Sequence, residues 1–300
     1  MMLRYLLVGV WLAWGIAYPL MSWSLDAIDM FSSRVVVMVL SGLTLLTAGA
    51  VVGGGAVWPP RHAWRWIVLA GLVNMACFQV FLIAGVYLLG PARTPIVIYT
   101  MPAWSALFAM LFLKEHISAR VAAAAGLGLV AVAIVVMQEQ KTTSIPLGTG
   151  LTLLAAISFG IGTVLTKAAK WQGDPTVFAG WQLLVGAVPV VALWLLCRDY
   201  TYLRLDQTHG LVALAFLILI SNSLAYFCWF RIIKALPASV AGVTTLIVPC
   251  VGFGASVFLI GGDISALDIL ALCLVLVSVT LVLTEQNALD RKASASTERP

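Results

Sequence analysis

Apolar runs of about twenty residues, separated by short polar stretches, recur along almost the whole chain. A helix rises about 1.5 Å per residue, so a run of about 20 apolar residues can cross the hydrocarbon core of a bilayer. Charges, glycines and prolines mark the ends of these runs. The pattern predicts ten transmembrane helices, over residues 4–24, 29–52, 63–89, 92–112, 118–138, 147–168, 175–197, 208–232, 237–260 and 266–285.

The composition excludes an ordinary water-soluble enzyme. Of the 300 residues, 62% are hydrophobic and 10% are charged, whereas soluble domains average roughly 45–50% and about 25%. The five cysteines stand singly in or beside apolar stretches, without metal-ligand spacing, and are interpreted as packing residues. No acidic residue falls near the middle of a predicted span. We therefore expect no metal, no cofactor and no membrane-embedded enzyme chemistry.

The basic residues predict the orientation of the chain. With ten spans and a cytoplasmic N-terminus, twelve of the 17 Lys and Arg residues lie on the cytoplasmic side and five on the outer side. This bias follows the positive-inside rule and places both termini in the cytoplasm. The net charge of +5 is thus explained without a nucleic-acid partner. Residues 287–300 are predicted to form a disordered cytoplasmic tail. Arg34, Lys167 and Arg231 are the deepest charges, and we expect them to snorkel toward an interface.

The two halves of the chain align with an offset of about 145 residues, which indicates an internal repeat. Each half contains five spans, an odd number, so the second half must enter the membrane from the opposite side. The sequence therefore predicts an all-α integral membrane protein with two inverted five-helix repeats, over 1–140 and 145–286. A duplicated scaffold without transport is the alternative. The aligned segments are Trp14-Gly15-Ile16 with Phe159-Gly160-Ile161, Gly90-Pro91-Ala92 with Leu236-Pro237-Ala238, Pro102 with Pro249, and Ile117-Ser118 with Ile264-Ser265.

Polar and aromatic residues inside the spans are candidates for a binding site. Asn74 and Phe78 share a helix face, and Asn222 and Tyr226 repeat that spacing in the second half. An amide followed by an aromatic ring could hold the polar head and the ring of a substrate. Ordinary packing remains the alternative, since Asn often bonds across membrane helices and Thr often bonds its own helix. The substrate-binding candidates are Trp14, Asn74, Phe78, Gln79, Tyr99, Thr163, Asn222, Tyr226 and Thr245.

Three prolines inside spans are candidates for helix kinks. Proline has no N–H to donate, so Pro19, Pro102 and Pro249 each leave one helix carbonyl without its usual partner. Such oxygens could accept hydrogen bonds from a substrate ammonium group. The alternative for each proline is that it only kinks the helix, and that a neighbouring side chain or a water molecule bonds the freed carbonyl.

The starts of the two halves (Trp14-Gly15 and Phe159-Gly160), together with segments 85–118 and 227–265, resemble the drug/metabolite transporter superfamily. The chain is similar to its EamA-like ten-helix members, and most similar to YddG-type aromatic amino-acid exporters. This resemblance implies a secondary transporter that exports aromatic and other neutral amino acids across a bacterial inner membrane. Transport would use alternating access through a central uncharged cavity between helices one, three, four, six, eight and nine.

Export of drugs or of other small metabolites such as nucleosides is the alternative function, because an apolar aromatic cavity would suit them equally well. The expected partners are the small-molecule substrate and the lipid bilayer, and a monomer is the favoured oligomeric state.

Overall fold

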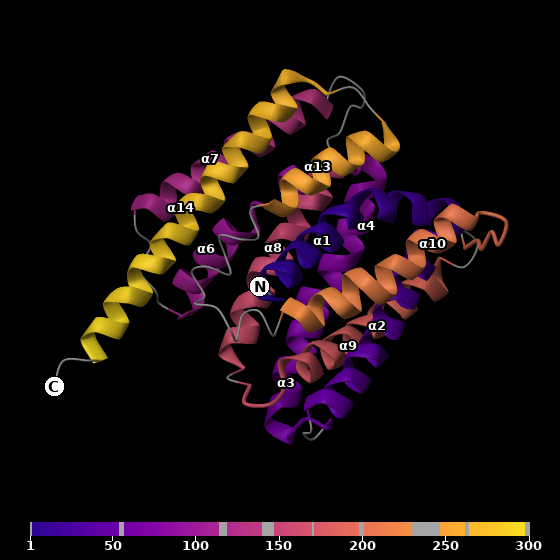
Figure 1. Cartoon of the computed structure of the whole chain (residues 1–300), viewed down its shortest axis with the longest axis horizontal. Helices are drawn as coiled ribbons and strands as arrows, with labels where there is room; N and C mark the ends of the chain where they lie inside the picture. The colour runs from indigo at the N-terminus through magenta and orange to yellow at the C-terminus, as the bar shows by residue number, and fades with distance from the viewer. Residues whose placement is uncertain are drawn as a thin grey trace.

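In the computed structural model, the chain forms a bundle of long helices (Figure 1). The structure describes residues 2–53, 57–113, 119–139, 147–169, 171–197, 201–229, 247–261 and 264–297. The α-helices of these ranges are α1 (Met2–Ala27), α2 (Met30–Gly53), α3 (Trp64–Ala70), α4 (Phe78–Leu89), α5 (Thr94–Ile98), α6 (Met101–Leu113), α7 (Ala119–Glu139), α8 (Leu147–Ala168), α9 (Pro175–Leu196), α10 (Thr208–Phe216), α13 (Ile247–Ile260) and α14 (Ala266–Thr297). A 3-10 turn, η1 (Arg61–Ala63), and two π-helical segments, η2 (Gly71–Cys77) and η4 (Leu217–Leu224), complete them.

Within the described ranges, ten apolar helical segments correspond to the predicted crossings. Eight are long enough to span a membrane, and Ile247–Ile260 and Ala266–Leu281 are shorter apolar helices. The all-α membrane fold predicted from the sequence is thus confirmed. The third crossing runs without interruption through α3, η2 and α4, and the eighth runs through α10 and η4. The first part of the predicted ninth span, with Thr245, lies outside the described residues, as does Arg231.

The fourth crossing is divided near its proline. Helix α5 ends at Ile98 and α6 begins at Met101, so Tyr99 and Thr100 form a turn between them. Pro102 lies in the first turn of α6, where a missing N–H costs least. By contrast, α1 continues through Pro19 without a change of helix type. Pro249 lies near the start of α13, and the carbonyl of Thr245 that it would leave free is outside the described residues.

Helices that correspond in the two halves pack on each other in antiparallel pairs. Helix α2 packs most extensively on α9, and α7 on α14. Along the first pair, Gly42 approaches Leu184 while Gly49 approaches Val177, so the residue numbers run in opposite directions. An antiparallel self-pair requires a two-fold axis perpendicular to the helices, which is the geometry of inverted repeats. Figure 1 shows these two pairs at opposite ends of the bundle, with the other crossings between them.

The remaining contacts between the halves also come in equivalent pairs. Helix α1 packs on α13, just as α8 packs on α6. At the first crossing, a Cβ on Gly15 would lie 2.4 Å from Val251 Cγ1, and at the second a Cβ on Gly160 would lie 2.9 Å from the backbone nitrogen of Ser105. Both crossings therefore need a residue without a side chain. The glycines that align in the sequence thus make equivalent contacts in the fold.

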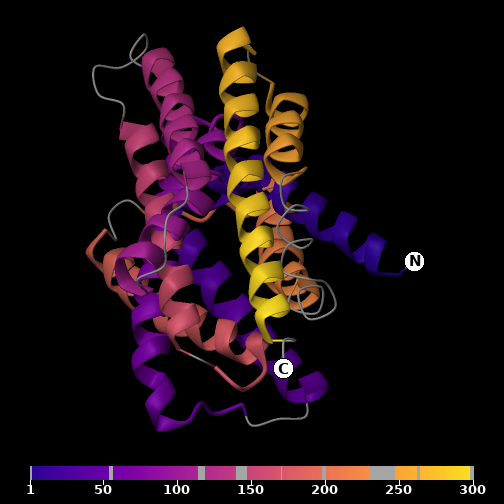
Figure 2. The ribbon, with the colours of Figure 1, turned by 90° about the vertical axis from the view of Figure 1, so that its left-hand side faces the viewer.

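Helix α14 is longer than the last predicted span. It continues to Thr297, so residues 287–297 are helical where the sequence predicts a disordered tail. Residues 286–297 contain no proline or glycine and include Ala, Leu, Arg and Lys, which all favour helix. Figure 2 shows α14, in yellow, as one uninterrupted helix that passes α7 and continues beyond it.

Candidate functional site

Two π-helical segments occupy equivalent places in the two halves, and each carries one asparagine. Segment η2 contains Asn74 in the third crossing, and η4 contains Asn222 in the eighth. A π-helix widens the turn, and such segments occur frequently at functional sites. In η4 the side chains follow the wider turn: Asn222 Nδ2 donates to Leu217 O at 2.9 Å and Ser223 Oγ donates to Ile218 O at 2.7 Å. The local structure therefore fixes the orientation of the Asn222 amide.

Each asparagine is hydrogen-bonded to a glutamine of the other half. Gln79 Nε2 donates to Asn222 Oδ1 at 3.1 Å, and Asn74 Nδ2 donates to Gln182 Oε1 at 3.5 Å. Gln79, Gln182 and Asn222 are buried. Asn74 Oδ1 is also buried and has no hydrogen-bond partner. These four amides form two hydrogen-bonded pairs across the interface between the halves, and we call them together the amide layer.

Arg34 contributes a positive charge to the amide layer. Its side chain is completely buried, and its Nη1 donates to Gln79 Oε1 at 3.4 Å. The expectation that Arg34 snorkels to an interface is therefore wrong. It lies on the helix face that also buries Met38 and Leu45, where α9, η4 and α4 surround α2. A buried cation thus lies beside the amides, whereas the sequence predicted an uncharged cavity.

Aromatic rings lie beside the amide layer. Trp14 contacts Tyr226 and Trp229 edge to face, with ring centroids 5.7 and 5.4 Å apart. Its indole Nε1 donates to Ser221 O at 3.2 Å, which ties α1 to η4. At a second contact between the halves, the tilted rings of Phe78 and Phe159 have centroids 5.4 Å apart. Edge-to-face pairs of this kind stabilise beyond their buried area, so these rings form a defined aromatic surface. The structure thus brings Trp14 and Tyr226 together near Asn222.

Other predicted candidates lie outside the amide layer. Tyr99 is buried in the apolar cluster that contains Tyr18, and Trp14 and Phe78 pack against that cluster. Thr163 is exposed, and its hydroxyl donates to Phe159 O in its own helix at 2.9 Å, which is the ordinary role of Thr in a membrane helix. Tyr99 is therefore part of the apolar core, and Thr163 bonds its own helix although its neighbour Gly162 packs against Asn74.

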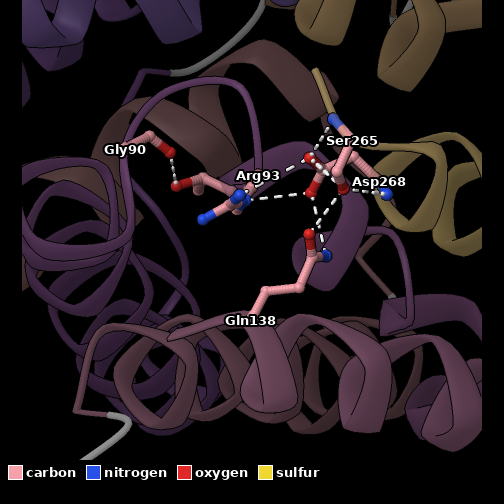
Figure 3. Close-up of polar contacts among 6 residues, drawn as sticks. Gly90, Arg93, Gln138, Ser265 and Asp268 are labelled. Atoms are coloured by element: carbon pink, nitrogen blue, oxygen red, sulfur yellow. Dashed lines mark hydrogen bonds and ion pairs between the residues drawn. The ribbon is translucent and has the colours of Figure 1, made fainter. Parts of the chain in front are cut away.

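A second polar cluster, which the sequence did not predict, joins Arg93 and Gln138 of the first half to the start of α14 (Figure 3). Arg93 Nε lies 2.9 Å from Asp268 Oδ1, and Gln138 Nε2 donates to the same oxygen at 3.1 Å. Ser265 N donates to Asp268 Oδ2 at 3.0 Å. Asp268 is thus bound by Arg93 beside α5, by Gln138 in α7 and by Ser265 beside α14. The signal for this cluster was weak, because these residues are far apart in the sequence and join only when α14 packs on α7.

Comparisons with known proteins agree with this fold. A sequence model of the EamA-like transporter family matches residues 3–137 and again residues 146–284. An uncharacterized transporter of Synechocystis sp. is 24% identical over 293 residues, which cover 92% of this chain and 88% of that protein. A chloroplastic WAT1-related protein of Arabidopsis thaliana is 26% identical over 234 residues, or 75% of this chain. That match spans 55% of the length of the plant protein.

The fold itself also has a solved counterpart. A crystal structure superimposes with a TM-score of 0.65 at 16% identity, and the match covers 96% of this chain and 98% of that one. At this identity the likeness concerns the fold alone. The two family matches, by contrast, together cover nearly the whole chain and coincide with the two five-helix halves. The chain belongs to the EamA-like transporter family.

Proposed function

We propose that this transporter exports aromatic and other neutral amino acids across a bacterial inner membrane. The observation that carries the proposal is the pair of amide bonds between the halves, Gln79–Asn222 and Asn74–Gln182. Amide groups offer both donors and acceptors, so they suit a solute that carries an ammonium and a carboxylate group. The rings of Trp14, Tyr226 and Phe78 supply an apolar surface beside them.

Alternating access between the halves is the proposed mechanism. A neutral hydrogen bond contributes only about 0.5–1.5 kcal/mol net, so the two bonds between the halves can break and re-form during a transport cycle. Their lengths differ, at 3.1 Å for Gln79–Asn222 and 3.5 Å for Asn74–Gln182. In transporters built from inverted repeats the site lies between the halves, so contacts that cross the interface change when the site opens to the other side. In the proposed orientation both termini are cytoplasmic, and the Arg93–Asp268 cluster lies at the outer end.

The protein is proposed to work as a monomer. Repeat one covers residues 1–140 and repeat two covers residues 145–286, and the amide layer lies between these repeats within a single chain. The substrate site therefore needs no residue from a second copy.

Reconstitution into liposomes tests the proposal directly. Labelled phenylalanine, tryptophan, threonine and methionine should each cross the membrane faster than in empty vesicles. Imposing a pH gradient during the same assay shows whether flux follows the solute gradient alone or is coupled to protons. If none of the four amino acids crosses faster than in empty vesicles, the amino-acid assignment fails, and protection of cells against drugs or nucleoside analogues becomes the assay of choice.

A further inference from the structure

Arg34 is a completely buried cation in the interior of a membrane protein. It lies on the face of α2 that also buries Met38, Ser41 and Leu45, each at most 1% exposed. This face packs on α9 and η4, so the guanidinium group is surrounded by protein. Long basic side chains in membrane proteins normally reach water or a counter-charge. A position that provides neither requires an explanation.

No carboxylate of the described ranges balances this charge. The ion pairs there are Arg93–Asp268 and His209–Asp26. Asp29, the acidic residue nearest to Arg34 in sequence, instead accepts hydrogen bonds from the backbone N–H groups of Phe31, Ser32 and Tyr202. Removing an ion from water is expensive unless an opposite charge and good hydrogen bonds compensate for it. The described residues provide no such opposite charge for Arg34.

The hydrogen bonds of Arg34 are also incomplete. A guanidinium group has five N–H donors. Nη2 donates to Ser33 Oγ at 3.0 Å and Nη1 donates to Gln79 Oε1 at 3.4 Å, whereas the buried Nε has no partner. Both acceptors are neutral, and the bond to Gln79 is long. The Nε and Nη groups of one guanidinium fork together match the two oxygens of a carboxylate.

We infer that Arg34 binds the carboxylate group of the transported solute at the edge of the amide layer. The inference rests on the proposed function and narrows its substrate class to solutes that carry a carboxylate. A carboxylate would pair with the unpartnered Nε and release Gln79 from its long bond. The ammonium group of an amino acid could then be accepted by an amide oxygen, of which the buried and unpartnered Asn74 Oδ1 is one. Such a site prefers zwitterions and carboxylates over amides and amines.

Competition against uptake of labelled phenylalanine by wild-type proteoliposomes is the first test. The competitors are unlabelled phenylalanine, 3-phenylpropionate, which keeps the carboxylate, and phenylalaninamide, which replaces it with a neutral amide. Phenylalanine and 3-phenylpropionate should compete, and phenylalaninamide should be at least about tenfold weaker, the size expected for a charged bond lost at a buried site. Equal competition by phenylalaninamide would overturn the inference without any variant.

Three variants complete the test. Arg34→Gln should raise KM for phenylalanine at least about tenfold and remove the difference between the carboxylate and amide competitors. Arg34→Lys keeps the charge without the planar fork, so it should retain that difference at lower affinity. Arg204→Gln removes one charge from an exposed position and should behave like wild type. A folded Arg34→Gln protein with wild-type KM and selectivity would rule the inference out. If Arg34→Gln fails to fold, Arg34→Lys is compared with wild type instead.

A binding measurement separates this inference from the proposed function. If no amino acid is transported, the function is wrong, and thermal unfolding of the purified protein then tests the anion site alone. Stabilisation of the wild type by 3-phenylpropionate, absent in Arg34→Gln, would support a carboxylate site. Stabilisation by chloride and not by 3-phenylpropionate, or by neither anion, would refute it.

Discussion

Gln79 in α4 donates a hydrogen bond from Nε2 to Oδ1 of Asn222 in η4, across 3.1 Å and 143 residues of sequence. This bond joins the two repeats through neutral groups. Gln79 Oε1 also accepts from Arg34, so one amide connects a buried cation of the first repeat with a π-helical segment of the second. Rearrangement of either partner must therefore affect the other.

Breaking this bond should lower flux more than stability. Asn222→Leu removes the acceptor for Gln79 and the donor to Leu217 O. Hydrogen bonds between membrane helices contribute about 0.6–2 kcal/mol, so the protein should stay folded. Flux of amino acids in proteoliposomes should fall at least about tenfold, which is the change expected when about 1.4 kcal/mol of binding to the solute is lost.

A double-mutant cycle tests whether the bond itself is responsible. The variants are Gln79→Ala, Asn222→Ala and the double variant, compared by unfolding in detergent, with an expected coupling of about 1 kcal/mol. Ser223→Ala is the matched control, because Ser223 bonds only within its own helix segment, to Ile218 O. Additive effects of the two alanines, within about 0.3 kcal/mol, would show that the amides act independently.

The Arg93–Asp268 pair should be asymmetric in its response to mutation. The Asp268 side chain is 3% exposed and that of Arg93 31%. Arg93→Gln leaves a buried carboxylate without its cation and should lower the free energy of unfolding by about 3–5 kcal/mol. Asp268→Asn leaves a cation that can reach water, so it should lower the free energy of unfolding by less. Thermal unfolding of the two variants measures this order, and a larger loss for Asp268→Asn would contradict it.

Much of the fold follows from local sequence patterns. The length of the apolar runs and the charged residues at their ends predicted the spans. Pro102 indicated a break in the fourth span, which the structure places at Tyr99 and Thr100. The alignment of Gly15 with Gly160 predicted two equivalent positions, and both prove to be close helix crossings. Runs of apolar residues, prolines and aligned glycines are visible in the sequence itself, so these features can be predicted before the packing of the helices is known.

The site was less accessible to prediction. The sequence singled out Asn74 and Asn222, but the segments around them are mostly apolar, so the hydrophobic pattern gave no sign that the helix widens to a π-turn there. The burial of Arg34 depends on which face of α2 meets α9. The spacing of Arg34, Met38 and Leu45 marked one helix face, but lipid or protein could have covered it. Whether lipid or protein covers this face is determined by the packing between the repeats.

Trp14 should distinguish aromatic substrates from small ones. Trp14→Ala removes the ring that contacts Tyr226 and Trp229, so an aromatic substrate loses part of the surface proposed to hold it. KM for phenylalanine should rise several-fold more than KM for threonine, because aromatic contacts contribute about 0.5–1.5 kcal/mol. Trp58→Ala is the control, since Trp58 is exposed and packs with Trp64 and Trp181 instead. If KM rises equally for phenylalanine and threonine, Trp14 does not contact the aromatic ring of the substrate.

Helix α8 offers a matched pair of glycines for testing the close crossing between repeats. A Cβ on Gly160 would lie 2.9 Å from both Ser105 N and Trp104 Cβ, whereas a Cβ on Gly150 would meet nothing within 4 Å. Backbone cannot move aside cheaply, so Gly160→Ala should destabilise by about 1–3 kcal/mol. Gly150→Ala should be neutral or stabilise by up to about 1 kcal/mol, because alanine favours helix.

Unfolding of both variants in the same detergent gives the comparison. The change is the same, glycine to alanine in one helix, so the difference between the variants isolates the helix crossing from helix propensity. Gly15→Ala, at the equivalent crossing of α1 with α13, would place its Cβ 2.6 Å from the Cβ of Val251, an atom fixed to the backbone, and should therefore cost at least as much as Gly160→Ala. If Gly160→Ala is as stable as Gly150→Ala, then α8 and α6 are not in close contact, and the packing of the repeats derived from these crossings is incorrect.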